Sequence, residues 1–195
     1  MASKSCLFTV DKTTGLLDPA QFRESPNHDD RPDNADPTLI IIHGISLPPG
    51  EFGGREVEQL FTNRLDWDAH PFFAEIRGLE VSAHLFIRRD GSVIQFVPLT
   101  KRAWHAGASC FRGRECCNDY SIGIELEGAD ETPYDDRQYP VLQGVIRAIC
   151  AAFPAITART LAAHSDIAPG RKTDPGPAFD WLRLYDGLGN QEGAS

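Results

Sequence analysis

The stretch PTLIIIHG, residues 37–44, contains a short run of apolar, mostly β-branched residues between a proline and a glycine. Such a continuous run is typical of a strand that is buried on both faces in the centre of an α/β sheet. His43 ends this predicted strand, and ligand crevices in open α/β sheets form outside the carboxyl ends of strands. His43 is therefore a candidate site residue. The alternative is a core histidine that is satisfied by one backbone hydrogen bond.

Further strands and helices are predicted after this stretch. Residues 81–97 show a period of two around Asp90-Gly91, which predicts a hairpin, and shorter patterns predict strands over 121–127 and 160–163. Apolar residues at helical spacing predict helices over residues 54–64, 68–76, 135–153 and 179–185. A chain of 195 residues normally forms one domain. We therefore expect a single α/β domain over residues 1–195, with a peripheral lead-in at 1–23 and a peripheral tail at 187–195.

Glu125 lies in the middle of the predicted strand over residues 121–127, on the same face as Gly123. A glutamate beside a glycine has free space in front of it, as a carboxylate in a pocket would. An exposed sheet face gives the same pattern, and it is the favoured interpretation when the strand is considered alone.

A loop late in the chain, HSDIAPGRKTDPGP at residues 164–177, carries an imidazole, a lysine and a carboxylate within eleven residues. Its prolines and glycines prevent a regular helix or strand. Irregular loops with fixed polar groups often hold ligands or catalytic side chains. The alternative is a surface turn rich in proline and glycine, which is a common feature.

The composition limits the partners and the compartment. A net charge of −9 lacks the basic field that binds nucleic acid or an anionic membrane, so a small or local partner is expected. The apolar run at the amino terminus is too short for a secretory signal or a membrane helix, which predicts a cytoplasmic protein. The five cysteines are scattered and odd in number, which favours reduced thiols. A thiolate metal cluster at Cys110, Cys116 and Cys117 is the alternative, although it lacks paired C-x-x-C spacing.

His43, His164 and Asp174 together match a catalytic zinc site, which has three protein ligands and an open fourth position. Zinc in such a site activates water near neutral pH. Glu125 would then act as general acid and base, and Lys172 would stabilise an oxyanion. These parts predict a metal-dependent amide hydrolase. Because His43 lies far from the late loop in sequence, only the fold can bring the parts together.

The loop after the predicted hairpin contains Trp104 and His105, which form either a ligand wall or a packed turn. The following polar loop, residues 107–119, carries Arg114. We predict that Trp104, His105 and Arg114 contact the substrate. His84 has no partner in the sequence and is predicted to be structural.

Five segments of the chain carry a resemblance to a known family. They are HGISLPPGEFGG (43–54), VSAHLFIRRDG (81–91), RAWHAG (102–107), CNDYSIGIELEG (117–128) and HSDIAPGRKTDPGPAFDW (164–181). In this order, from about residue 24 to 182, the chain resembles the AmpD-type 1,6-anhydro-N-acetylmuramyl-L-alanine amidases. These enzymes belong to the larger zinc amidase family, which also contains bacteriophage amidases and peptidoglycan recognition proteins.

The resemblance implies a mixed β-sheet flanked by helices and a zinc ion as cofactor. His43, His164 and Asp174 match the family's zinc ligands, Glu125 its catalytic acidic residue and Lys172 its oxyanion-stabilising lysine. The implied reaction is hydrolysis of the amide between the lactyl group of muramic acid and L-alanine, in small muropeptides that are recycled in the cytoplasm. One position departs from the pattern, since Gly44 stands where the AmpD pattern usually has asparagine. Gly44 cannot make the side-chain hydrogen bond to substrate that an asparagine could offer there.

Two other functions within the same family are alternatives to a recycling amidase. An amidase that acts on polymeric cell-wall peptidoglycan would have the same chemistry, but it would be expected to carry an export signal or a wall-binding module. A peptidoglycan-binding module without catalysis would be expected to lack a metal ligand or the catalytic acid, whereas all five positions are filled here. The sequence makes no prediction of the oligomeric state.

Overall fold

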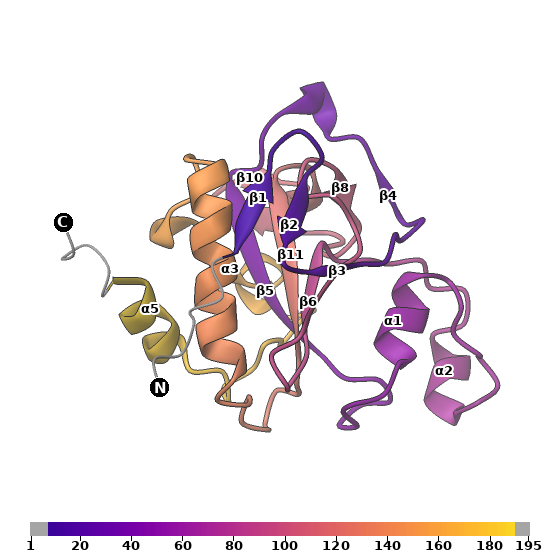
Figure 1. Ribbon diagram of the computed structural model, residues 1–195. Helices are drawn as coiled ribbons and strands as arrows, with labels where there is room; N and C mark the ends of the chain where they lie inside the picture. The colour runs from indigo at the N-terminus through magenta and orange to yellow at the C-terminus, as the bar shows by residue number, and fades with distance from the viewer. Residues whose placement is uncertain (1–7, 190–195) are drawn as a thin grey trace.

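The computed structural model describes residues 8–189, and a six-stranded mixed sheet runs through its centre (Figure 1). The strand order is β12 (Leu161–Ala163), β5 (Leu39–Ile45), β11 (Ser121–Glu127), β6 (Leu85–Ile87), β7 (Val93–Gln95) and β3 (Gln21–Phe22). The first four are parallel, β7 is antiparallel to β6, and β3 is parallel to β7. The carboxyl ends of four neighbouring strands therefore lie at one edge of the sheet.

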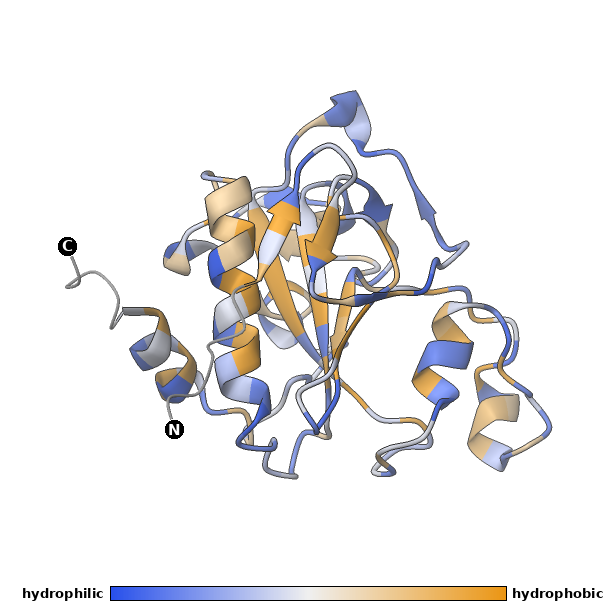
Figure 2. Cartoon of the chain, in the orientation of Figure 1, coloured by the Kyte–Doolittle hydropathy of each residue, from blue (hydrophilic) through white to orange (hydrophobic). Residues whose placement is uncertain are grey.

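The central strands are buried on both faces. Ile40 and Ile42 of β5 pack in one hydrophobic cluster with α3 (Gln138–Ala152), which stands at the left of the strands in Figure 1. Leu39 and Ile41 point the other way and join a second cluster beside α4 (His164–Ile167). Figure 2 shows the resulting concentration of hydrophobic residues along the strands. This two-sided burial explains the continuous apolar run in β5.

Three peripheral helices complete the domain. α1 (Glu56–Phe61) and α2 (Pro71–Glu75) lie on the right in Figure 1, and their apolar side chains join a cluster with Phe86 and Phe96. α5 (Trp181–Gly189) packs beside α3. Its Leu184 is fully buried.

Short elements connect these parts. They are the strands β1 (Thr9–Asp11), β2 (Leu16–Asp18), β4 (His28–Asp29), β8 (Arg102–Ala103), β9 (Cys110–Phe111) and β10 (Arg114–Glu115), and the 3₁₀ helices η1 (Pro32–Asn34), η2 (Cys117–Asp119) and η3 (Ala158–Thr160).

The predicted fold class, a mixed sheet flanked by helices, is confirmed. The predicted helix over residues 135–153 is α3, and it begins at Gln138. Pro140 therefore lies in the first turn, where an N–H group has no partner within the helix. The predicted hairpin exists as β6 and β7 but is shorter than expected. The carbonyl of His84 still accepts from the backbone N–H of Phe96, but the N–H of Ser82 donates to the carbonyl of Trp104 instead.

One prediction about the surface was wrong. The favoured exposed face of residues 121–127 does not exist, because all seven residues of β11 are buried between its neighbours and the covering loops. The described part of the lead-in consists largely of exposed residues, and its hairpin of β1 and β2 packs against α3 through β1 and buries Leu17. Residues 1–7 of the lead-in and 190–195 of the tail lie outside the described residues, and residues 187–189 are the end of α5.

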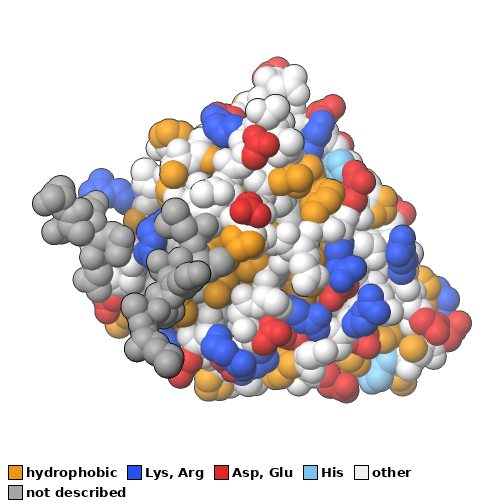
Figure 3. Space-filling view, viewed as in Figure 1, with side chains coloured by type: hydrophobic (Ala, Val, Ile, Leu, Met, Phe, Trp, Pro, Cys, Tyr) orange, Lys and Arg blue, Asp and Glu red, His pale blue; other side chains and the backbone are white. Residues whose placement is uncertain are grey.

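The surface carries both signs of charge. On the face in Figure 3, Lys and Arg side chains alternate with Asp and Glu side chains over the lower part of the molecule. Within residues 8–189, no helix is both long enough and apolar enough to cross a bilayer.

Candidate active site

The parallel strands bring three candidate residues to one edge of the sheet. β5 and β11 are paired over their full length, and this register places Glu125 directly opposite His43. β12 lies on the other side of β5 and leads straight into α4, of which His164 is the first residue. The sheet register alone therefore places His43, Glu125 and His164 together.

The late loop then returns over these strand ends and adds Asp174. Nδ1 of His43 lies 2.9 Å from Nδ1 of His164 and 3.2 Å from Oδ2 of Asp174. Nδ1 of His164 lies 3.1 Å from the same Oδ2 atom. Two imidazole nitrogens and one carboxylate oxygen thus converge from three elements on one point. These three residues form a group that can hold a metal ion.

The donor set fits zinc. Two imidazole nitrogens and a carboxylate oxygen form a ligand set known from catalytic zinc sites, which leave a fourth position open. Burial opposes the ionised form of Asp174, but hydrogen bonds from the two imidazoles outweigh it and lower the pKa of Asp174. Burial lowers the pKa of His43 to about 4, which favours the neutral imidazole that a metal requires.

Glu125 lies beside these donors, and within residues 8–189 it forms no ion pair with a lysine or an arginine. Its Oε1 is 3.9 Å from Nδ1 of His43, and its Oε2 is buried with no hydrogen-bond partner in the described part of the chain. Burial raises the pKa of Glu125 well above its usual range, Asp174 raises it further, and Lys172 opposes both. A buried carboxylate with an unpaired oxygen is typical of a group that exchanges a proton during a reaction.

A cavity of about 190 Å³ gives access to these groups. Its polar lining consists of Ser82 and the ionisable residues His105, Glu125, His164, Lys172 and Asp174, and its apolar lining comes mainly from α1 and the segment before β6. The predicted oxyanion group, Lys172, is therefore in the same cavity as the candidate general base. The five residues predicted for catalysis and metal binding all lie at this site.

The loop that carries Lys172 and Asp174 is fixed at three points. Arg171 donates from Nη2 to the carbonyl oxygens of Ala106 and Ala108, at 2.6 and 2.7 Å. The backbone N–H of Ser165 donates to the carbonyl of Asp174. Tyr134 donates its hydroxyl hydrogen to the carbonyl of Pro175 at 2.9 Å.

Tyr134 also accounts for the space beside Gly44. A Cβ atom at residue 44 would lie 2.1 Å from the Tyr134 hydroxyl oxygen, and a Cβ at Gly128 would lie 2.2 Å from a carbon of the same ring. Gly44, which replaces the asparagine of the AmpD pattern, therefore lies against Tyr134. The tyrosine fills the space that a side chain at residue 44 would need. Sequence reasoning missed Tyr134, because a single tyrosine in a polar loop gives no signal of its own.

The three predicted substrate contacts lie in different places. His105 lines the cavity, with its Nδ1 atom 2.9 Å from Nε2 of His43. Trp104 is half-buried and does not line the cavity, and its backbone pairs with Ser82. Arg114 is exposed on β10, with its guanidinium 3.8 Å from the centre of the Tyr120 ring. Of the three, only His105 is brought to the metal-binding group.

The four cysteines in the described part of the chain contribute no ligand to this site. Cys110, Cys116, Cys117 and Cys150 are free thiols, which agrees with the predicted reduced state, and Cys6 lies outside the described residues. Cys117 is buried, with its sulfur 3.2 Å from the hydroxyl oxygen of Tyr120, whereas Cys110 and Cys116 are exposed. Among the described residues, His43, His164 and Asp174 form the one group of three His, Cys, Asp or Glu side chains that could hold a metal ion.

Comparison with known proteins agrees with this geometry. Residues 33–177 match the family model of N-acetylmuramoyl-L-alanine amidases. The chain belongs to this amidase family. The predicted resemblance is therefore confirmed, and with it the class of enzyme, a hydrolase of carbon–nitrogen bonds.

Individual amidases are similar over most of the chain. The 1,6-anhydro-N-acetylmuramyl-L-alanine amidase AmpD of Enterobacter cloacae is 59% identical over 171 residues, which cover 88% of this chain and 91% of that protein. A crystal structure of a selenomethionine derivative of AmpD superposes with a TM-score of 0.89 at 53% identity, covering 92% of this chain and 98% of the other.

A more distant amidase has been solved with a bound substrate. AmiD from Escherichia coli, in complex with anhydro-N-acetylmuramic acid-L-Ala-D-γ-Glu-L-Lys, matches with a TM-score of 0.58 at 27% identity. The match covers 93% of this chain and 65% of the AmiD chain.

Proposed function

We propose that this amidase hydrolyses the amide bond between the lactyl group of 1,6-anhydro-N-acetylmuramic acid and L-alanine in small muropeptides, with zinc as its cofactor. One observation carries the proposal. Two imidazoles and a carboxylate converge beside a buried, unpaired Glu125 oxygen in one cavity. The chain that builds this cavity is 59% identical to an amidase named for the anhydro substrate.

His43, His164 and Asp174 would hold the zinc. When bound, zinc lowers the pKa of a coordinated water to about 7 and polarises a carbonyl oxygen. The lowered pKa of the buried His43 supports this role, because a neutral histidine is the form that binds a metal. Asp174 supplies one negative charge to balance the cation.

Glu125 would move the proton. Its unpaired oxygen is positioned to accept a proton from the attacking water and then to deliver that proton to the leaving nitrogen of L-alanine. The raised pKa of Glu125 suits both steps, because a carboxylate of ordinary pKa holds a proton too weakly to deliver it near neutral pH. A group of this kind contributes about 10² to 10⁴ in rate.

Lys172 would stabilise the negative charge that develops on the attacked carbonyl oxygen. Its side chain lines the cavity together with Glu125. In a site from which water is largely excluded, a fixed positive charge acts more strongly than it does in bulk water.

The size of the substrate follows from the relatives. AmiD, a structural neighbour, was solved with an anhydro-muramyl tripeptide, and AmpD is named for the anhydro sugar. These two similarities support a small muropeptide as the ligand of this chain. We place the reaction in the recycling of such fragments in the cytoplasm, and fractionation of cells that produce the protein tests that compartment.

A comparison of two substrates tests the proposal. The full chain, loaded with zinc, is given either purified anhydro-muramyl tripeptide or intact sacculi with the same number of cleavable bonds. We expect the tripeptide to be cleaved much faster. Equal rates, or faster cleavage of sacculi, would support an amidase of polymeric peptidoglycan instead, and absence of cleavage in both would support a binding module.

A further inference from the structure

His105 lies behind His43, on the side of the ring that faces away from His164 and Asp174. Its Nδ1 is 2.9 Å from Nε2 of His43, and the two rings are perpendicular with their centres 5.0 Å apart. His43 is almost completely buried, with 1% of its surface exposed. Nε2 of His43 therefore has His105 as its hydrogen-bond partner.

The positions of the protons follow from this contact. If Nδ1 of His43 offers its lone pair to a metal, the proton must be on Nε2, which then donates to Nδ1 of His105. Nδ1 of His105 is then an acceptor, so its proton is on Nε2, which lies 3.3 Å from Oγ of Ser121. Ser121 in turn donates to the carbonyl of Cys117 at 2.6 Å. Each hydrogen bond in the series from His43 through His105 and Ser121 to Cys117 then has one donor and one acceptor.

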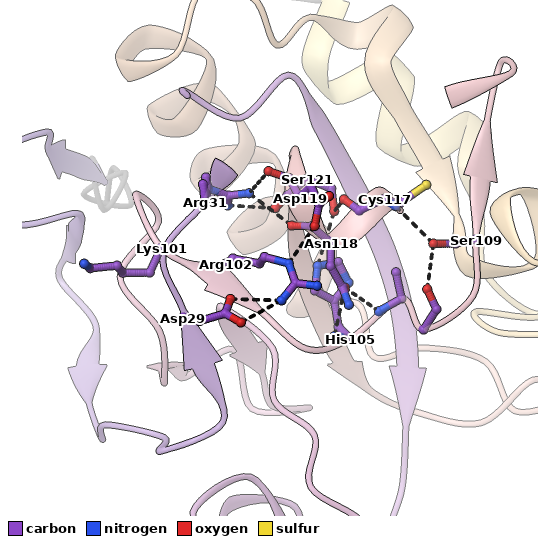
Figure 4. A network of polar contacts seen from close by, with 12 residues as sticks. Asp29, Arg31, Lys101, Arg102, His105, Ser109, Cys117, Asn118, Asp119 and Ser121 are labelled. Carbon is purple, nitrogen blue, oxygen red and sulfur yellow. Dashed lines mark hydrogen bonds and ion pairs between the residues drawn. The ribbon is translucent and has the colours of Figure 1, made fainter. Parts of the chain in front are cut away.

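The backbone around His105 is fixed independently of the metal-binding group. The N–H groups of His105 and Ala106 both donate to Oδ1 of Asn118, at 3.1 and 2.8 Å (Figure 4). The carbonyl oxygen of Asn118 accepts a hydrogen bond from Arg31, which is itself buried. The position of the imidazole is therefore set by a polar network at the start of β11.

The sheet leaves a place for the ring. A Cβ atom on Gly123 would lie 2.5 Å from Cγ of His105, so a larger residue in the middle of β11 would displace the imidazole. This contact explains why residue 123 is a glycine. The space in front of Gly123, beside Glu125 on the same strand, holds a histidine that contacts a candidate metal ligand.

We propose that His105 is a positioning residue, which fixes the tautomer and the orientation of His43 and thereby sets the affinity of the site for its metal. This inference rests on the metal site of the proposed function. It changes the role predicted from the sequence, because His105 acts on a metal ligand and not on the substrate. It also gives a role to Asn118 and Ser121 in the motif CNDYS, which the catalytic residues leave unexplained.

Four variants of the full chain test the role of His105. His105→Phe keeps a flat ring but removes the acceptor, and His105→Asn keeps an acceptor close to the position of Nδ1. His105→Gln places its amide nearer to Ser121 than to His43. His70→Phe, at the start of α2 and outside the cavity, is the matched control for a histidine replaced by phenylalanine. The readouts are the zinc dissociation constant, from competition with a chelator, and the visible spectrum of the cobalt-substituted protein.

We expect His105→Phe to weaken zinc binding by about 10- to 100-fold, the usual effect of losing a hydrogen-bond partner behind a metal ligand. His105→Asn should bind zinc more tightly than His105→Gln and close to the wild type. The cobalt spectrum should change in His105→Phe and not in His70→Phe. Thermal unfolding of the metal-free proteins shows whether each variant is folded. If His105→Phe does not fold, the difference in zinc affinity between His105→Asn and His105→Gln tests the proposal.

Two results would overturn the proposal. One is a zinc affinity that stays within about threefold of the wild type in both His105→Phe and His105→Gln. Such a change would be much smaller than the loss expected when a hydrogen-bond partner of a metal ligand is removed. The other is normal zinc binding with a higher KM for the muropeptide, which would make His105 a substrate contact. The wild type is measured first, and failure of the wild type to bind zinc would refute the metal site itself.

Discussion

His43 and Glu125 lie on neighbouring strands, whereas Lys172 and Asp174 lie on a loop that crosses the ends of those strands. We refer to the first pair as the strand half of the site and to the second pair as the loop half. The strand half is fixed by the continuous ladder between β5 and β11, in which both strands are buried. Its geometry can change only if the core of the sheet changes.

The loop half depends on a few separate contacts. Tyr134, Ser165 and Arg171 hold the loop through individual hydrogen bonds. Each such bond contributes about 0.5 to 1.5 kcal/mol to stability. The comparison shows that one ligand and the base are built into the fold, while another ligand and the cation are held locally. Substitutions in the loop half should therefore alter the site with little effect on folding.

The largest effect is expected in the strand half, from Glu125→Gln. We expect kcat to fall by about 10² to 10⁴, because the general acid and base is lost, while zinc stays bound. Turnover of the anhydro-muramyl tripeptide and zinc content are measured on the same preparation. Glu115→Gln, on the exposed strand β10, is the control and should keep full activity. Unchanged turnover in Glu125→Gln would remove Glu125 from the mechanism.

In the loop half, Lys172→Met should lower kcat by about 10² to 10³, the range seen when a donor to an oxyanion is removed. Its unfolding temperature should stay close to that of the wild type, because the loop is held by other residues. Lys12→Met serves as the control, since Lys12 is exposed and remote from the cavity. A loss that is confined to KM would assign Lys172 to ground-state binding of the substrate.

The contact between the two halves is tested at Gly44, which follows His43 and meets Tyr134. Gly44→Ala should reduce the free energy of unfolding by about 1 to 3 kcal/mol, because the added methyl group overlaps the Tyr134 hydroxyl. Removing that hydroxyl in Tyr134→Phe should recover part of the loss. Urea denaturation of both single variants and the double variant gives the coupling energy. Additive effects would show that the Tyr134 hydroxyl does not limit the residue at position 44.

The sequence predicted more of the strand half than of its surroundings. The apolar run before His43 and the alternation around Glu125 predicted both strands, and the family resemblance predicted the roles of the two side chains. The register that sets Glu125 opposite His43 is not encoded by either pattern, because strand pairing depends on the whole sheet. The burial of Glu125 follows from that pairing and from the covering loops. The pattern of β11 alone therefore favoured an exposed position for the face that carries Glu125, which was wrong.

The contacts behind the site were beyond the reach of sequence patterns. Tyr134 and Asn118 act through a hydroxyl and an amide on atoms that are distant in the chain. His105 was predicted as a substrate contact, since an imidazole next to a tryptophan and a glycine gives no sign of its hydrogen bond to His43. The burial of Leu17 in the same hydrophobic cluster as residues of α3 was also missed, because two three-residue strands show too little periodicity.

Metal analysis of the purified full chain tests the central claim most directly. We predict about one zinc ion per chain, bound by His43, His164 and Asp174, since the three donors form one site. Removal of the metal with a chelator should abolish cleavage of the anhydro-muramyl tripeptide, and added zinc should restore it. A chain that contains no zinc and keeps full activity after chelation would contradict the account.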